Sequence, residues 1–413
     1  MHAFHVIFRK YPCTSISLPG DSVPAVNAID KLQDLVARSD EFIKRMHQIG
    51  AAPNNKKQLE RLFSPGEAAE MVGRDRTTLA RAEAELQVVR PARNPETNYR
   101  LGYTLEQIQI FRTHFGTLPW RDPATDRPMI VACQNFKGGV GKSTTCVNFS
   151  HYLALKGYRV LVIDTDSQAT TTSFFGYVPD EELTGQDTIL PYLFGEKETL
   201  DYAVRRTYWP NIDLVPACLA LYDSEISVVV HLAQQTDPAK RREFFSELRF
   251  AIDSVSERYD VILIDSPPAL GVIALSSLMA ADALIVPTGA KMLDFTSTAQ
   301  FFRMILNYIH QIDPGKTYQW INVLTTQFSR RASLQPQFVD TIRNIFGDSA
   351  FERVVHETTE LQFSAAMFGT PYEAKKPNRK TLAMLDSVFE EIEIAIQRCW
   401  PSKAEQLSQR GIV

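Results

Sequence analysis

A glycine-rich segment with two lysines and a serine is the part of the sequence best suited to chemistry. It lies in Met129–Thr145 (MIVACQNFKGGVGKSTT), where an apolar run is followed by glycines and then by Lys142 and Ser143 at the predicted start of a helix. Backbone N–H groups of such a turn can cradle phosphate oxygens, and the helix N-terminus adds positive charge. Lys142 would reach the β- and γ-phosphates, and the Ser143 hydroxyl would bind Mg²⁺. The residues predicted to bind the phosphates are Lys137, Gly138, Gly139, Val140, Gly141, Lys142, Ser143 and Thr144.

The loop departs from the usual G-x4-G-K-[ST] pattern, because Phe136 stands where the first glycine is expected. The match is therefore to a variant, KGGVGKST, which carries the additional lysine Lys137. A plain surface turn is the alternative interpretation. That alternative is improbable, because an apolar strand, the glycines, a Lys-Ser pair and a helix follow one another at the spacing of a phosphate-binding loop.

Three aspartates follow two of the apolar runs. Asp164 and Asp166 come after Val160–Ile163, and Asp265 comes after Val261–Ile264. Side chains at the carboxyl ends of parallel strands point into the ligand crevice, where one carboxylate can hold Mg²⁺ and another can orient an attacking water. A single such aspartate is often only a helix cap, but three beside a phosphate loop indicate function. The predicted metal ligands are Ser143, Asp164 and Asp265.

A parallel sheet is needed to bring these motifs together. After residue 128, short apolar runs alternate with helical patterns, which is typical of a mostly parallel α/β sheet with helices on both faces. A long amphipathic helix is predicted over Lys380–Trp400. The predicted strands are Met129–Cys133, Val160–Ile163, Ile212–Val215, Val261–Ile264, Ala283–Val286 and Ile321–Leu324.

The stretches KGGVGKST, VIDTDSQ and ILIDSPP together resemble the ParA/MinD group of deviant Walker-A ATPases, over most of residues 128–390. The resemblance implies a P-loop NTPase fold, ATP and Mg²⁺ as ligands, ATP hydrolysis and an ATP-sandwich homodimer. By that resemblance Lys137 is the signature lysine, which crosses to the phosphates of the partner subunit. Asp166 would organise the hydrolytic water, so Lys137 and Asp166 are the expected catalytic residues. Asp265 would be the Walker-B carboxylate.

Other members of this group fit the sequence less well. Reductases and scaffolds of the iron–sulfur type need bridging cysteines, whereas the five cysteines here are scattered without metal-ligand spacing. MinD ends in a basic amphipathic membrane helix, whereas Leu382–Ile396 here carries four acidic residues and no Lys or Arg, so anionic lipid would repel it. Bacterial tyrosine kinases of this group end in a tyrosine cluster, which is absent from the sequence. The plasmid-partition ParA branch remains, and Leu284–Thr288 and Leu324–Thr326 resemble its later strands, whose ends help to hold adenine.

A small helical unit precedes the sheet. Ser64–Glu67 is a capping box with proline at the first helical position, the helix stops at Gly73, and Asp75 can cap a second helix over Arg76–Leu86. This spacing suits a helix-turn-helix, with Val88–Tyr99 as a basic wing. A helical hairpin used only for dimer contacts is the alternative. The predicted DNA contacts of the second helix are Arg76, Thr77, Thr78 and Arg81.

Length and charge agree with a protein of several globular domains. The chain has 413 residues, 44% of them apolar, and a formal net charge of −4, which excludes a uniformly basic nucleic-acid-coating protein. Residues 56–121 carry eleven Lys/Arg against eight Asp/Glu, so any DNA contact should be local. We expect a helical dimerisation arm over 1–57, a helix-turn-helix domain over 58–120 and an ATPase domain over 121–413.

Local patterns fill in these domains. The arm would be a helix over Val26–Met46, with a helix folded onto its own domain as the alternative, and residues 1–20 are expected to be weakly ordered. The stretches Gly50–Lys57 and Arg121–Arg127 are expected to be linkers. A further capped helix is predicted over Leu105–Phe115.

The domain order resembles the large partition ATPases, in which a helix-turn-helix precedes the ATPase. The resemblance implies a ParB-type centromere-binding partner, operator binding in autorepression, and non-specific binding to nucleoid DNA. Arg330 and Arg331, or Lys375–Lys380, could form that DNA surface, and a merely solvated charged face is the alternative for each. No apolar run is long enough to cross a membrane, so we expect a cytoplasmic, nucleoid-associated protein with no membrane partner. An ATP-switched transcription repressor without a segregation role and a metal-cluster reductase remain alternatives.

Overall fold

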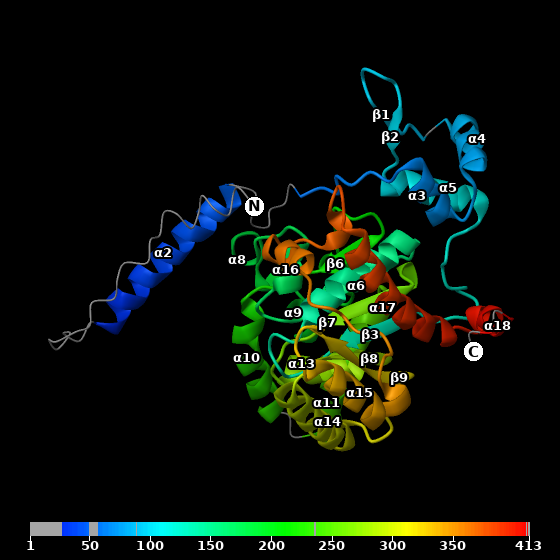
Figure 1. Ribbon diagram of the computed structural model, residues 1–413. Coiled ribbons are helices and arrows are strands. Elements are labelled where there is room, and N and C mark those ends of the chain that lie inside the picture. Colours follow the sequence, from blue (N-terminus) through cyan, green and yellow to red (C-terminus); the bar gives the residue numbers. More distant parts are fainter. Residues whose placement is uncertain (1–26, 49–56, 88, 235–236, 410, 412–413) are drawn as a thin grey trace.

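A seven-stranded sheet forms the centre of the computed structural model, which describes residues 27–48, 57–87, 89–234, 237–409 and 411 (Figure 1). Its strand order is β5-β6-β4-β7-β3-β8-β9, and every pair is parallel except β5 with β6. The bounds are β3 (Met129–Cys133), β4 (Val160–Asp164), β5 (Arg205–Arg206), β6 (Ile212–Val215), β7 (Val261–Asp265), β8 (Ala283–Gly289) and β9 (Trp320–Thr326).

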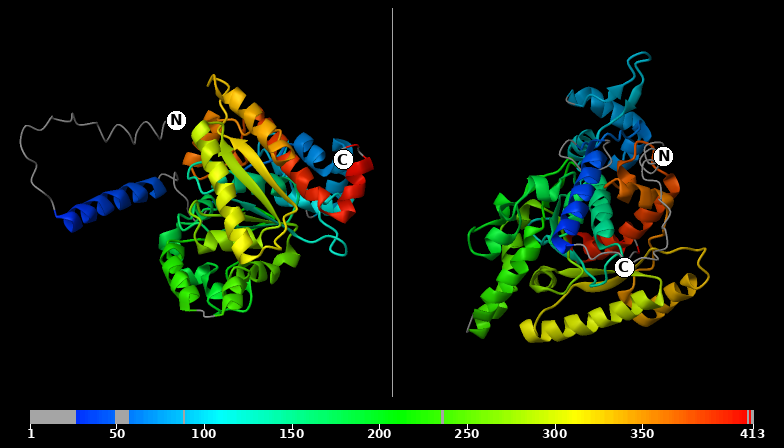
Figure 2. Two further views of the ribbon diagram at one scale, coloured as in Figure 1. Left: turned by 90° about the horizontal axis from the view of Figure 1, so that it is seen from below. Right: turned by 90° about the vertical axis from the view of Figure 1, so that its left-hand side faces the viewer.

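Alternate residues of the central strands enter two cores, one on each face of the sheet. On β3, Val131 packs into the first core and Ile130 into the second. The first core includes α6 (Lys142–Lys156) and α17 (Arg379–Arg398). The second core is covered by α9 (Leu190–Leu193), α10 (Ala220–Gln234), α12 (Glu247–Asp253), α13 (Val272–Ala280), α14 (Met292–Ile312) and α15 (Gln335–Phe346). Figure 2 shows these two layers from the side.

The predicted fold class is confirmed, and each of the six predicted strands forms with bounds that match or extend the prediction by one to three residues. The antiparallel edge strand β5 was not predicted, because two residues carry no usable periodicity. The shorter helical segments are α7 (Thr170–Phe174), α8 (Pro179–Glu182), α11 (Pro238–Phe244), α16 (Thr359–Ala366), α18 (Pro401–Gln409), η1 (Gly185–Asp187), η2 (Leu200–Tyr202), η3 (Ser256–Arg258), η4 (Gly347–Ser349) and η5 (Pro371–Glu373). Within the described ranges, no helix combines the length and the apolar content needed to cross a bilayer.

The N-terminal unit contains the predicted helices α3 (Pro65–Val72), α4 (Arg76–Leu86) and α5 (Leu105–Phe115). Both expected capping boxes form at the starts of α3 and α5, and the Asp75 carboxylate accepts hydrogen bonds from the first turn of α4. Between α4 and α5 lies a short antiparallel pair of strands, β1 (Ala92–Arg93) and β2 (Arg100–Gly102). Only β1 falls within the predicted wing Val88–Tyr99, and β2 begins at the residue that follows it.

A buried arginine joins this unit to the sheet domain. Arg112 of α5 donates from Nε to the Met71 carbonyl near the end of α3 at 3.1 Å, and from Nη2 to the Leu155 carbonyl near the end of α6 at 2.6 Å. The carboxyl ends of helices carry partial negative charge, so one cation suits both. Burial lowers the pKa of Arg112 to about 10. Trp120 donates to the Gly157 carbonyl at the same junction.

The second predicted linker is fixed to the domain rather than being a free tether. It contains neither helix nor strand, but Arg121 and Asp126 are buried. The Arg121 guanidinium pairs with Glu257 at 2.7 Å, and Asp126 accepts the Ser402 N–H at 3.0 Å. The segment is thus a connection without helix or strand that packs against the domain, and its charge and turn-forming residues did not reveal these partners in advance.

The N-terminal helix α2 (Ala28–Gln48) overlaps the helix predicted over Val26–Met46 and is shifted by two residues toward the C-terminus. Its apolar residues are largely exposed, Ile29 at 66% and Val36 at 57%, and the helix lies apart from the sheet domain in Figures 1 and 2. The expectations for residues 1–20 and for the linker Gly50–Lys57, except its last residue Lys57, lie outside the described residues.

Replacing Gly157 with alanine should destabilise the junction. Gly157 has φ +109°, and a Cβ there would lie 2.8 Å from Arg112 Nη1. We expect the free energy of unfolding in urea to fall by about 2–4 kcal/mol, from backbone strain and crowding together. Gly116→Ala is the control, since Gly116 has φ +63° with open space around it, and it should cost about 1 kcal/mol. Equal losses in the two variants would contradict the tight junction.

Candidate functional site

The predicted phosphate loop connects β3 to α6 at the carboxyl edge of the sheet. Gly139 and Gly141 adopt φ of +76° and +89°, a conformation that glycine reaches without strain. The end of β9 holds the loop, since Thr326 Oγ1 donates to the Val140 carbonyl at 2.8 Å and Gln327 Nε2 donates to the Gly139 carbonyl at 2.5 Å. These contacts attach the phosphate loop to the end of β9.

Lys142 lies beneath this loop. It is 6% exposed, and its Nζ donates to the Lys137 carbonyl at 3.3 Å. Burial lowers the pKa of Lys142, and the negative charges of Asp265 and Asp166 oppose that shift. A phosphate group would bring further negative charge to this buried ammonium.

Lys137 forms an ion pair with Asp294, near the start of α14. Asp294 is buried, and its carboxylate lies close to Gly289, where a Cβ would lie 2.1 Å from Asp294 Oδ2 and would force the side chain to shift. In the single chain Lys137 therefore points to its own domain. Sequence reasoning missed Asp294, because no motif relates residues 157 positions apart; the pairing of β3 with β8 brings them together.

Asp164 and Asp265 are fully buried neighbours at the ends of β4 and β7. Consecutive threonines of α7 hold them: Thr171 Oγ1 donates to Asp265 Oδ2 at 2.7 Å, and Thr172 donates from N and Oγ1 to Asp164 Oδ2 at 2.8 Å. The Asp166 N–H donates a hydrogen bond to Asp164 Oδ1 at 3.1 Å. Both oxygens of Asp164 are thus bonded within the chain.

Asp265 keeps one oxygen available. Its Oδ1 is buried with no hydrogen-bond partner among the described residues, and the Ser143 hydroxyl lies close enough to favour the ionised form of the same carboxylate. Burial raises the pKa of Asp265 to about 6, and the hydrogen bond from Thr171 and the nearby Ser143 hydroxyl oppose the rise. Burial and the neighbouring Asp265 charge likewise raise the pKa of Asp164 well above its ordinary value. An unbonded carboxylate oxygen beside a serine hydroxyl suits Mg²⁺ or a water bound to it.

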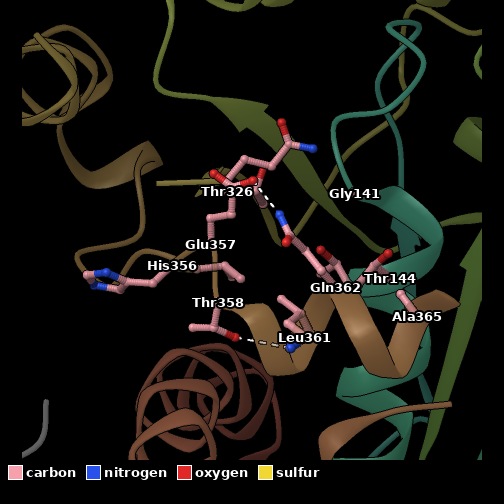
Figure 3. A pocket seen from close by; sticks show the side chains of 12 residues that line it. Gly141, Thr144, Thr326, His356, Glu357, Thr358, Leu361, Gln362 and Ala365 are labelled. Carbon is pink, nitrogen blue, oxygen red and sulfur yellow. Dashed lines mark hydrogen bonds between the residues drawn. The ribbon is translucent and has the colours of Figure 1, made fainter. Parts of the chain in front are cut away.

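A cavity of about 160 Å³ opens beside the phosphate loop (Figure 3). Of the two stretches expected to approach adenine, 324–326 reaches this cavity through Thr326, whereas no residue of 284–288 lines it. Sequence reasoning missed the opposite wall, which comes from residues 355–365. There Gln362 Nε2 donates to Glu357 Oε1 at 2.6 Å. The lining residues are Gly141, Thr144, Thr145, Thr326, Gln327, Val355, His356, Glu357, Thr358, Leu361, Gln362 and Ala365.

The residues predicted to bind DNA lie in two places far from each other in the chain. On α4, Arg76, Thr77 and Arg81 are exposed, whereas Thr78 is half-buried and its hydroxyl donates to Asp75 Oδ2 at 2.6 Å. Arg330 and Arg331 are exposed in the loop after β9. Arg330 acts on the cavity residue His356, since burial and then the Arg330 charge lower the pKa of that imidazole.

A glycine-rich loop between a parallel strand and a helix, with aspartates at the ends of adjacent strands, defines a P-loop NTPase. A family model described as an AAA domain matches residues 128–315. Protein SopA of Escherichia coli K12 is 36% identical over 312 residues, which cover 74% of this chain and 79% of SopA. The chromosome partitioning protein ParA of Caulobacter vibrioides is 33% identical over 245 residues, covering 59% of this chain and 85% of that protein.

A solved structure named Partition Protein shares the fold, with a TM-score of 0.64 at 16% identity, and covers 90% of this chain and 99% of that one. The chain belongs to the ParA family of partition ATPases.

The raised pKa of Asp265 predicts a pH-dependent stability difference. Its folded value of about 6 lies above its ordinary 3.8, so the ionised carboxylate destabilises the folded, nucleotide-free protein above about pH 6, and this cost disappears as the pH falls toward 4. Asp265→Asn should therefore raise the free energy of unfolding at pH 8 by on the order of 1–3 kcal/mol, and by much less at pH 4.5. Chemical denaturation at both values measures this.

A matched control is Asp340→Asn, because the Asp340 side chain is 71% exposed. Its effect should be small and similar at both pH values. The buried-carboxylate interpretation fails if Asp265→Asn stabilises the protein equally at both.

Proposed function

We propose that the chain hydrolyses ATP with Mg²⁺ at the carboxyl edge of the sheet. The observation that carries the proposal is the convergence of the phosphate loop, the buried Lys142 and the unbonded Asp265 Oδ1 next to Ser143. Lys142 and the loop amides bind the phosphates, and the neighbouring cavity receives the base.

Ser143 and Asp265 would hold Mg²⁺, which when bound supplies charge neutralisation to the phosphates. Asp164, also expected to bind the metal, already accepts hydrogen bonds at both oxygens, so we assign it to supporting the loop that carries Asp166. Asp166 is 8% exposed and orients the attacking water. This division of roles follows from which carboxylate oxygens the chain itself leaves available.

Lys137 acts across an ATP-bound homodimer, and it must leave Asp294 to do so. The exposed apolar residues of α2 support a second dimer contact, because a helix with Ile29 and Val36 in water gains free energy by burying them. The boundaries 1–57, 58–120 and 121–413 remain those of our domain proposal.

Two DNA surfaces complete the proposal. The α3–α4 pair binds the operator as a helix-turn-helix, with Arg81 toward the bases, while Arg330 and Arg331 contact nucleoid DNA of any sequence. A ParB-type partner stimulates turnover, as the membership of a partition family suggests. An ATP-switched repressor would bind the operator but show no partner-stimulated hydrolysis.

Variants of the catalytic residues separate binding from turnover. Lys142→Ala should lose ATP binding, because the buried cation beneath the phosphate loop is removed. Asp166→Ala should bind ATP and dimerise but hydrolyse it very slowly, since only the orientation of water is lost. Lys137→Ala should keep some binding but lose ATP-dependent dimerisation and turnover, because it acts across the dimer. Nucleotide titration, light scattering and phosphate release measure the three properties. Unchanged hydrolysis in Lys137→Ala refutes its role, and loss of ATP binding in Asp166→Ala makes Asp166 a structural or metal residue.

Variants of two arginines separate the DNA modes. Arg81→Ala should weaken operator binding by roughly 1–3 kcal/mol and affect random DNA much less, if Arg81 pairs with a base. Arg331→Ala should weaken ATP-dependent binding to any sequence and reduce the salt slope by about one unit. Anisotropy titrations at several salt concentrations measure both. Equal weakening on both DNAs by Arg81→Ala would leave α4 with backbone contacts only.

A further inference from the structure

A largely buried lysine links the N-terminal segment to the nucleotide domain. Lys57 is the first described residue after α2 and the gap that follows it, and its side chain is 20% exposed. Its Nζ donates to the Phe368 carbonyl at 2.7 Å and to the Phe174 carbonyl at 3.0 Å, and it pairs with Glu373 at 3.0 Å. The ammonium group also lies 4.8 Å from the centre of the Tyr208 ring.

The two carbonyls that Lys57 binds belong to the ends of two helices. Phe174 is the last residue of α7, and Phe368 follows the end of α16, where it adopts a left-handed φ of +49°. The Phe174 carbonyl lies in the last turn of its helix and lacks a partner within that helix, so outside donors hold it: Lys57, and the Tyr208 hydroxyl at 3.3 Å. The Phe174 and Phe368 rings are also in contact, with centroids 6.2 Å apart. Within this junction, the Lys57 ammonium is the charged group that bonds to both chain segments.

These two helices line different parts of the nucleotide site. Thr171 and Thr172 of α7 hold the carboxylates of Asp265 and Asp164. Three residues of α16 line the cavity beside the phosphate loop: Leu361, Gln362 and Ala365. The metal end and the base end of the site are thus tied together through Lys57, at a point outside both.

We propose that Lys57 is a positioning residue for nucleotide binding and hydrolysis: it holds the carboxylate-bearing end of the site at a fixed distance from the base cavity. This rests on the nucleotide site proposed above. None of the sequence motifs includes Lys57, which lies 80 or more residues before the phosphate loop. By this proposal the N-terminal segment that contains Lys57 contributes to ATP hydrolysis together with the sheet domain.

A purely structural role is the competing explanation, in which Lys57 only neutralises Glu373. The Glu373 side chain is 15% exposed, and its partial burial raises its pKa while the charge of Lys57 opposes the rise. Removing Lys57 alone would leave that carboxylate without its cation, which is strongly destabilising. Lys57→Met combined with Glu373→Gln removes both charges, and it also removes the donor to the two carbonyls.

The double variant distinguishes the two roles. If Lys57 positions the helices, the double variant should melt close to the wild type yet bind ATP with Mg²⁺ about tenfold more weakly, because a charge-assisted donor is lost, and its kcat should fall several-fold. Lys57→Arg, which keeps a donor and the charge, should stay within about threefold of wild-type affinity. Normal melting with normal affinity and kcat in the double variant would overturn the proposal.

An exposed ion pair between the same two segments provides the control. Glu60 contacts Lys375 at 2.7 Å, with side chains 65% and 68% exposed, so Glu60→Gln should leave both ATP affinity and kcat unchanged. An effect of Glu60→Gln as large as that of the double variant would also overturn the specific role of Lys57.

Hydrogen exchange on the wild-type protein tests the same link without a variant. Coupling between sites is reciprocal, so bound nucleotide must in turn stabilise the Lys57 contacts. A non-hydrolysable ATP analogue with Mg²⁺ should slow amide exchange over residues 57–61 as well as in α7 and α16. Protection of α7 and α16 with no change at 57–61 contradicts the inference, whereas a wild type that binds no nucleotide contradicts the proposed function instead.

Discussion

Two buried carboxylates lie side by side at the ends of β4 and β7, and the site is arranged around them. Asp164 and Asp265 are paired residues of adjacent parallel strands, and burial raises the pKa of both. Like charges so placed are costly unless donors and cations surround them. Thr171, Thr172 and Lys142 supply that environment, and a bound cation would add to it.

The need to surround two adjacent carboxylates with donors also explains why Asp164 and Asp265 differ in the number of hydrogen bonds that they accept. Asp164 accepts three hydrogen bonds from its own chain, which fixes the turn that carries Asp166. Asp265 retains an unbonded oxygen beside the Ser143 hydroxyl. One carboxylate therefore serves the geometry of the loop, and the other is left for a ligand.

Helix α6 connects the nucleotide site to the N-terminal unit. It begins at the phosphate loop, and near its other end the Leu155 carbonyl accepts a hydrogen bond from Arg112 of the N-terminal unit. Lys57 makes a second connection, through the ends of α7 and α16. The N-terminal unit is thus bonded to elements that also line the nucleotide site, which gives a physical route for the two to influence each other.

The sequence by itself determined the features that depend on nearby residues. The apolar strands, the glycine turn before Lys142, and the capping boxes of α3 and α5 each arise within a short stretch of chain, so spacing and residue type were enough to predict them. The fold class followed, because alternating strands and helices allow few arrangements other than a parallel sheet.

Only the tertiary structure decided which distant groups meet. The strand order places Asp294 against Lys137, the packing of residues 355–365 closes the cavity, and Lys57 reaches the carbonyls of Phe174 and Phe368. These contacts join residues far apart in the chain, and a lysine or glutamate that will become buried looks in the sequence like one that stays in water. Their partners are set by strand order and packing, which no local pattern encodes.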